Sequence, residues 1–177
     1  IAGKTVGIVG CGQIGLVFAR LMQGFGCQLL AFDPQPDPAF TVLGGRYVEL
    51  DELFADSDII SLHCPLTPYT RHLIGPRELA MMKPGALLIN VGRGGLVDEQ
   101  ALLEALANGR LGGAGFDVAS IEPPPPDHPL MQALRYPNFI LTPHVAWASE
   151  ESMQRLADQL IDNINAFAAG RRQHRLV

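Results

Sequence analysis

Short runs of apolar residues alternate with segments of helical spacing along most of the 177-residue chain. The apolar runs are short, lack a polar residue at every second position, and are bounded by Gly or Pro. Such runs are typical of parallel strands whose two faces are both covered by helices. Seven strands are predicted on this basis, over residues 4–9, 28–32, 46–48, 59–63, 86–91, 113–117 and 139–142.

The segments between these strands have helical spacing. The first helix carries its apolar side chains at the one-face spacing of an amphipathic helix, and these are Ile14, Val17, Phe18, Leu21, Met22 and Phe25. Further helices are predicted over residues 50–55, 76–82, 99–108 (capped by Asp98) and 150–169. The apolar stripe of the last helix, which includes Leu156 and Ile164, is expected to pack in a core. The order of elements predicts an α/β fold with a doubly wound parallel sheet of Rossmann type, in a single domain over residues 1–177.

The turn after the first strand carries the glycines of a dinucleotide-binding loop. Gly10 permits a tight turn, Gly12 lets the backbone approach a pyrophosphate, and Gly15 lets the next helix pack against the strand. The free N–H groups at the start of that helix suit phosphate oxygens.

An acidic residue, Asp33, follows the second strand at close to the ~20-residue spacing of this fingerprint. Its carboxylate can accept both hydroxyls of an adenosine ribose, although Asp33-Pro34 can also simply start a turn. A carboxylate would repel a 2′-phosphate, and residues 34–45 contain no Arg or Lys that would bind one. The pattern therefore favours NAD over NADP.

Charge and cysteine content narrow the class further. A net charge of −5 argues against nucleic acid as a partner, and no run approaches the length of a membrane span. The 3 cysteines are odd in number and show no metal-ligand spacing, so we expect no metal site and a reducing, cytoplasmic location.

Three polar residues follow late strands of the predicted sheet: Arg93, Glu122 and His144. Ligands of open α/β sheets bind beyond the carboxyl ends of the strands, so these side chains can converge. An arginine fork binds a carboxylate, a histidine is an acid–base group near neutral pH, and a glutamate favours the charged imidazole. Each also has an ordinary alternative, as an ion-pair partner, a solvated loop acid or a loop hydrogen bonder.

Four ordered motifs resemble the D-isomer-specific 2-hydroxyacid dehydrogenase family, nearly from end to end of the chain. They are the glycine loop with His63-Cys64-Pro65-Leu66-Thr67, the segment from Asn90 to Asp98, Phe116-Asp117-Val118 with Glu122-Pro123, and Thr142-Pro143-His144. The segment from His144 to Ala148 looks most like the glycerate dehydrogenase/hydroxypyruvate reductase branch.

The resemblance implies hydride transfer between NADH and a small 2-keto acid. Arg93 would bind the substrate, His144 would give the carbonyl oxygen its proton, and Glu122 would support the imidazolium. The resemblance also implies cofactor contacts at Gln13 and Ile14 for the pyrophosphate, and at Pro65 and Thr70 for the adenosine. Beside the nicotinamide it implies Val91, Gly92 and Asp117. Trp147 is expected there too, because it lies three residues from His144.

The family builds a substrate domain largely from sequence that precedes the glycine loop. We therefore expect that domain to be missing here, and the 177 residues alone to have little or no activity. The family also implies a homodimer. Two alternatives stay open: an NAD-sensing corepressor of the same fold, and a Rossmann domain for another adenosine ligand.

Overall fold

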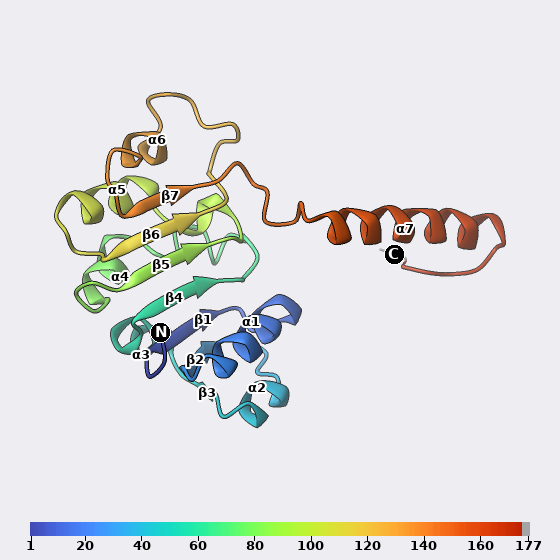
Figure 1. Ribbon diagram of the computed structural model, residues 1–177, viewed down its shortest axis with the longest axis horizontal. Coiled ribbons are helices and arrows are strands. Elements are labelled where there is room, and N and C mark those ends of the chain that lie inside the picture. Colours follow the sequence, from blue (N-terminus) through green and yellow to red (C-terminus); the bar gives the residue numbers. More distant parts are fainter. Residues whose placement is uncertain (175–177) are drawn as a thin grey trace. The chain divides into compact units, whose positions relative to one another are not determined.

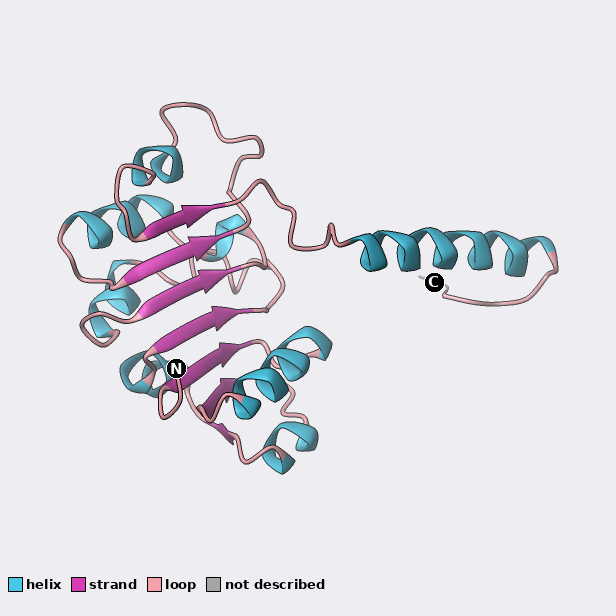
Figure 2. Cartoon of the chain, viewed as in Figure 1, coloured by secondary structure: helices cyan, strands magenta, loops and turns pink. Residues whose placement is uncertain are grey.

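A computed structural model describes residues 1–174 as two compact units, Ile1–Pro143 and a second that begins at His144. The first unit holds seven strands, β1 Thr5–Val9, β2 Gln28–Phe32, β3 Arg46–Tyr47, β4 Ile59–Leu62, β5 Leu87–Asn90, β6 Gly113–Phe116 and β7 Phe139–Leu141. They form one parallel sheet of order β3-β2-β1-β4-β5-β6-β7 (Figures 1 and 2). The strand order reverses between β1 and β4, which confirms the predicted doubly wound sheet.

The helices of this unit divide between the two faces of the sheet (Figure 1). One face carries α1 Gln13–Gly24 and α2 Pro38–Val42, and the other carries α3 Leu50–Asp56, α4 Pro76–Met81, α5 Glu99–Ala107 and α6 Pro129–Ala133. The sequence did not predict α2 and α6, because five residues are too few for a helical period. Both begin with a local device, a capping side chain (Asp37 or His128) followed by proline.

Two apolar clusters form the core, one on each face. The cluster beneath α1 and α2 centres on Val6, Ile8 and Phe40, and the larger cluster beneath α3 to α6 includes Phe54, Leu88 and Leu102. All of these side chains are essentially buried. Their burial fixes the carboxyl ends of the strands, where the predicted site residues lie.

Only part of the predicted apolar face of α1 packs against the core. Phe18 and Met22 pack against the core, whereas Val17, Leu21 and Phe25 are more than half exposed. The expectation that helices cover both faces of every strand also fails at β7, where Ile140 is 65% exposed. Within the first unit, the helices α1 and α2 cover only the β1–β3 side of their face, so the prediction does not hold for β7 in this unit.

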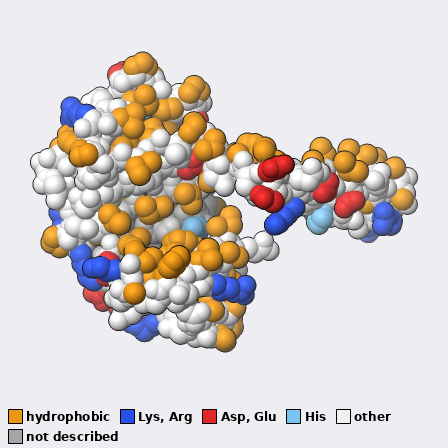
Figure 3. All heavy atoms as spheres, in the orientation of Figure 1, with side chains coloured by type: hydrophobic (Ala, Val, Ile, Leu, Met, Phe, Trp, Pro, Cys, Tyr) orange, Lys and Arg blue, Asp and Glu red, His pale blue; other side chains and the backbone are white. Residues whose placement is uncertain are grey.

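The second unit consists of a loop and one long helix, α7 Glu150–Ala168. Ser149 caps it by accepting a hydrogen bond from Ser152 N at 3.2 Å. Its apolar stripe is exposed, including Leu156, Leu160 and Ile164 (Figure 3). The core packing predicted for this stripe is thus not observed within this unit, because residues 144–174 contain no second helix or strand that could cover it.

No helix within residues 1–174 is both long and apolar enough to cross a bilayer. In the same part of the chain, no three His, Cys, Asp or Glu side chains are grouped as a metal site would require.

Candidate functional site: a nucleotide pocket and the loops beside it

The glycine loop joins β1 to α1 and has two close backbone approaches. Gly10 has a φ of +91°, a left-handed conformation that favours glycine, and a Cβ there would lie 2.5 Å from the backbone nitrogen of Cys64. A Cβ on Gly15 would collide with the carbonyl group of Gly10. These two glycines therefore serve the fold, by allowing the loop to turn against β4 and the helix to pack on the loop.

Gly12 differs from the other two glycines, because a Cβ on it would meet no protein atom within 4 Å. It occupies the N-cap position of α1, where no side chain accepts a hydrogen bond from the first turn. Gln13 and Ile14 are the first two residues of the helix. The open space and the uncapped N–H groups together fit a phosphate group at this end of α1.

Asp33 lies directly after β2, and the backbone holds both of its carboxylate oxygens. Cys11 N donates to Oδ2 at 2.8 Å, which ties Asp33 to the glycine loop. Gln35 N donates to Oδ1 at 2.8 Å, the geometry of an Asx turn. The turn-starting role and the ribose-binding role are thus compatible, because each oxygen keeps a further lone pair for a ligand hydroxyl.

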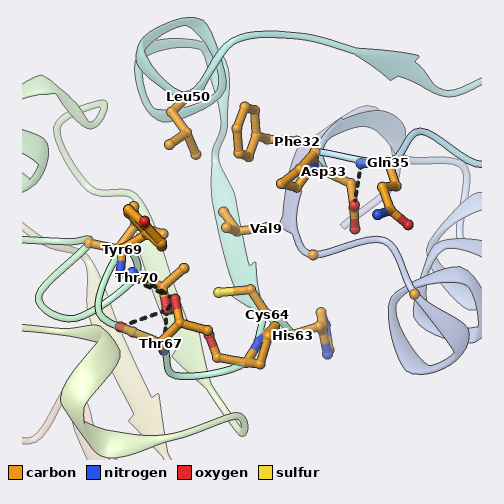
Figure 4. A pocket seen from close by; sticks show the side chains of 15 residues that line it. Val9, Phe32, Asp33, Gln35, Leu50, His63, Cys64, Thr67, Tyr69 and Thr70 are labelled. Atoms are coloured by element: carbon orange, nitrogen blue, oxygen red, sulfur yellow. Dashed lines mark hydrogen bonds between the residues drawn. The ribbon is translucent and has the colours of Figure 1, made fainter.

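A pocket of about 640 Å³ opens beside Asp33 and the glycine loop. Its wall comes from the ends of β1, β2 and β4 and from the loop after β4 (Figure 4), with Gly10, Gly12, Asp33, Pro65 and Thr70 among the lining residues. The Thr70 hydroxyl donates to the Pro65 carbonyl oxygen at 2.6 Å, which closes this loop on itself. The volume and the apolar lining suit a planar base with its ribose.

His63 also lines this pocket, and the sequence analysis gave it no role. Its Nε2 lies 2.9 Å from the Ser61 hydroxyl, and its ring lies 5.1 Å from that of Phe18, centroid to centroid. Burial lowers the pKa of His63 to about 4, and burial raises the pKa of the neighbouring Cys64 thiol to about 11. Both groups are therefore uncharged near neutral pH. Two sequence signals point to His63: its position at the end of a buried strand, and its place in the segment His63-Cys64-Pro65-Leu66-Thr67 that resembles the family.

The loop that carries Arg93 follows β5 and is held from inside by Asn90, which is completely buried. Asn90 Oδ1 accepts from Gly92 N at 3.1 Å, and Asn90 Nδ2 donates to the Arg93 carbonyl oxygen at 2.9 Å. The Arg93 side chain is exposed, and its guanidinium donates to the Gly92 carbonyl oxygen at 2.7 Å. A cation on a firmly held loop can bind a substrate carboxylate.

Asp117 and Glu122 follow the neighbouring strand β6. Asp117 is buried and accepts a hydrogen bond from the Thr142 hydroxyl at 2.5 Å. Glu122 is exposed, and its Oε1 accepts from Ala119 N at 2.9 Å, with a cis peptide bond to Pro123. Because Asn90 pairs with Phe116 in the sheet, the Arg93 and Glu122 loops leave adjacent strands at the same edge.

His144 and Trp147 belong to the second unit. His144 has a φ of +55°, and Trp147 Nε1 donates to its carbonyl oxygen at 2.9 Å. The structure therefore gathers Gly10, Gly12, Asp33, Pro65 and Thr70 around one pocket and puts Arg93 and Glu122 on adjacent loops. The convergence of His144 with that pair stays a prediction.

The fold and the pocket define a dinucleotide-binding domain of the doubly wound class. The model of the "D-isomer specific 2-hydroxyacid dehydrogenase, NAD binding domain" family matches residues 1–146, and the chain belongs to this family. The cofactor predicted from the sequence, NAD, agrees with that assignment.

Named relatives and solved structures agree with the family. The glycerate dehydrogenase of Methylorubrum extorquens is 51% identical over 174 residues, which are 98% of this chain and 53% of that protein. The hydroxypyruvate reductase of Blautia hydrogenotrophica is 44% identical over 168 residues, 95% of this chain and 51% of that protein. The NAD complex of the D-isomer specific 2-hydroxyacid dehydrogenase from Lactobacillus delbrueckii ssp. bulgaricus superposes with a TM-score of 0.91 at 33% identity, over 97% of this chain and 55% of that one. The chain thus spans about half the length of the relatives it matches.

Proposed function

We propose that the protein containing this chain is an NAD-dependent oxidoreductase that transfers hydride between NADH and a small 2-keto acid, forming the D-2-hydroxy acid. The observation that carries the proposal is the pairing of the nucleotide pocket with Arg93 and Glu122 on adjacent loops. Arg93 can bind a substrate carboxylate, and Glu122 can stabilise a charged imidazole. Neither role is needed in a domain that only binds an adenosine ligand. Relatives named as glycerate dehydrogenase and hydroxypyruvate reductase favour hydroxypyruvate or glycerate as the substrate.

NAD would supply the hydride acceptor or donor, and this chain would orient it. The N–H groups at Gln13 and Ile14 would hold the pyrophosphate where Gly12 leaves open space, and Asp33 would accept the ribose hydroxyls. Pro65 and Thr70 would line the adenosine side, and Val91, Gly92, Asp117 and Trp147 would lie beside the nicotinamide. The Asp33 carboxylate disfavours the 2′-phosphate of NADP.

The chemical roles follow from the side-chain types. Arg93 would bind the substrate carboxylate with its planar fork, which fixes the carbonyl group in place. His144 would donate the proton that the carbonyl oxygen takes up as hydride arrives, and Glu122 would favour the charged imidazole beforehand. Arg93 and Glu122 lie on the loops that leave β5 and β6 at the carboxyl edge of the sheet.

The test measures NADH oxidation with a panel of 2-keto acids. It uses the full-length product of the gene, including any sequence that flanks these residues. The variant His144→Ala should lose most turnover, by about 10²–10⁴-fold, because general acid catalysis contributes that much. Its NADH affinity, measured by titration calorimetry, should stay nearly unchanged. A large loss of NADH affinity would contradict the role given to His144, and no turnover by the parent would contradict the function.

The homodimer also belongs to this proposal. Val17, Leu21 and Phe25 form an exposed apolar stripe on α1, which is the kind of surface that a second subunit covers. Light scattering on the purified protein should give twice the mass of one chain.

A cytoplasmic location and a single coenzyme-binding domain complete the proposal. The 3 cysteines are all free, which suits a reducing compartment. The matched region of the relatives covers nearly the whole chain, which supports the assignment of both units to one domain. The corepressor alternative has no support among the relatives named above, all of which carry the names of dehydrogenases or reductases.

A further inference from the structure

A polar cluster, made of the buried side chains of Glu99 and His128 and the exposed Ser120, lies next to the two loops described above. Glu99 is the first residue of α5 and is only 7% exposed. Its Oε1 accepts from Ser120 N at 2.8 Å, and its Oε2 accepts from the Ser120 hydroxyl at 2.5 Å. His128 Nε2 lies 3.2 Å from the same Oε2 and 3.1 Å from the Ser120 hydroxyl.

The hydrogen bonds fix the tautomer of His128. Its Nδ1 accepts from Leu130 N at 3.3 Å, as the cap of α6, so Nδ1 carries no proton. The ring proton therefore lies on Nε2 and points to Glu99. The Glu99 carboxylate thus receives three donors from the segment between β6 and α6, which offsets the cost of burying its charge.

This cluster connects the two loops that carry Arg93 and Glu122. A turn of 3₁₀ helix at Gly94–Leu96 leads from Arg93 toward Glu99, while Ser120 lies two residues before Glu122. Gly94 is buried against the same segment, and a Cβ on it would collide with the backbone of Ala119 and Ser120. Ala119 N in turn holds Glu122 Oε1 at 2.9 Å. The two loops therefore meet at Gly94 and Ser120, and the hydrogen bonds from Ser120 to Glu99 stabilise that contact.

We propose that Glu99 and Ser120 are positioning residues for the dehydrogenase reaction: they fix the distance between the Arg93 loop and the Glu122 loop by joining α5 to the segment after β6. The inference rests on the proposed function, because it concerns the residues that act on the substrate. A buried carboxylate with directional partners sets one geometry, whereas apolar packing at this contact would permit several. Glu99, Ser120 and His128 are not among the residues that line the nucleotide pocket beside Asp33, so we expect their loss to affect the keto acid step and not the binding of the adenosine half of the cofactor.

The test uses Ser120, because the residue is exposed and its hydroxyl can be removed without opening the core. Ser120→Ala removes one of the bonds to Glu99, while Ser120→Thr keeps the hydroxyl and adds one methyl group at an exposed residue. Steady-state kinetics with NADH and the best keto acid should show kcat/KM lowered about 10-fold in Ser120→Ala, since small displacements of catalytic groups cost this much or more. Ser120→Thr should regain most of the parent value, and the Kd for NADH should be equal in all three proteins.

Glu99→Gln should show a similar loss, because an amide nitrogen cannot accept the bonds made by Oε2. Its matched control is Glu104→Gln on the exposed side of the same helix, where the carboxylate accepts a hydrogen bond from Gln100 Nε2 at 3.0 Å. Glu104→Gln should equal the parent. Equal kcat/KM for parent, Ser120→Ala and Ser120→Thr would overturn the inference, as would a parallel loss of NADH binding. Absence of turnover in the parent itself would instead overturn the proposed function.

Discussion

Gly12 and Gly15 are three residues apart, yet the structure predicts opposite effects when each is replaced by alanine. A methyl group on Gly12 projects into open space, where the pyrophosphate is proposed to lie. A methyl group on Gly15 projects into the carbonyl group of Gly10. Gly12→Ala should therefore weaken cofactor binding without harming the fold, and Gly15→Ala should harm the fold directly.

The expected sizes follow from the local geometry. At Gly12, φ is −74°, which alanine adopts freely, so the entropic gain of ~0.4–1 kcal/mol offsets the loss of a good N-cap residue. The free energy of unfolding should then change by less than ~1 kcal/mol. Overpacking at Gly15 costs ~1–3 kcal/mol. For a domain of this size these values correspond to Tm shifts of within ~4 °C for Gly12→Ala and a fall of ~2–12 °C for Gly15→Ala.

A methyl group placed against the pyrophosphate incurs a similar steric cost of ~1–3 kcal/mol in binding, so the Kd for NADH should rise about 5- to 150-fold in Gly12→Ala. Scanning calorimetry gives the Tm, and titration calorimetry gives the Kd on the same samples. NADH bound by Gly12→Ala as tightly as by the parent would refute the placement of the pyrophosphate. A Tm loss in Gly12→Ala equal to that in Gly15→Ala would refute the separation of the two roles.

Two further predictions concern the rim and the wall of the pocket. Asp33→Ala should weaken NADH binding and reduce the preference for NADH over NADPH, because it removes the ribose acceptor and the hydrogen bond from Cys11 N. Titrations with both cofactors measure the two Kd values. An unchanged ratio of these values would count against the role of Asp33. His63 should make stability depend on pH. Its pKa falls from 6.5 to about 4 on folding, so the unfolded chain binds more protons between these values. Stability should then rise from pH 4 to 6.5, by at most ~3 kcal/mol from this residue. Urea unfolding across that range should show a smaller slope in His63→Gln than in the parent, and equal slopes would contradict the burial of a neutral ring.

The sequence predicted the sheet and the nucleotide loop well, for reasons visible in single residues. Burial on both sides makes β1, β2 and β4 mainly apolar, with single polar residues such as Ser61 in β4. The glycines mark positions where a Cβ cannot fit or would face a ligand. The short helices α2 and α6 escaped prediction because one and a half turns carry no period. The α7 stripe was assigned to a core because helical periodicity shows that one face is apolar but cannot show what covers it.

The candidate site was predictable where a charged residue comes soon after the end of a strand. Asp33, Arg93 and Glu122 each come within a few residues of a strand end, so topology alone places them at one edge of the sheet. Glu99 and His128 gave no such signal. Their shared partner, Ser120, lies 21 residues from Glu99 and 8 residues from His128 in the sequence, and the three residues meet only in the folded chain. Buried polar pairs of this kind become visible only when the burial of each side chain is known.

If the protein uses NADH to form a D-2-hydroxy acid, the configuration of the product will show it. The protein would be incubated with NADH and hydroxypyruvate, glyoxylate or pyruvate, and the chiral products from hydroxypyruvate and pyruvate would be resolved by chromatography. We expect NADH consumption matched by D-glycerate or D-lactate, with much slower turnover when NADPH replaces NADH. An L product, or no NADH consumption by folded protein with any of these acids, would contradict the proposed function.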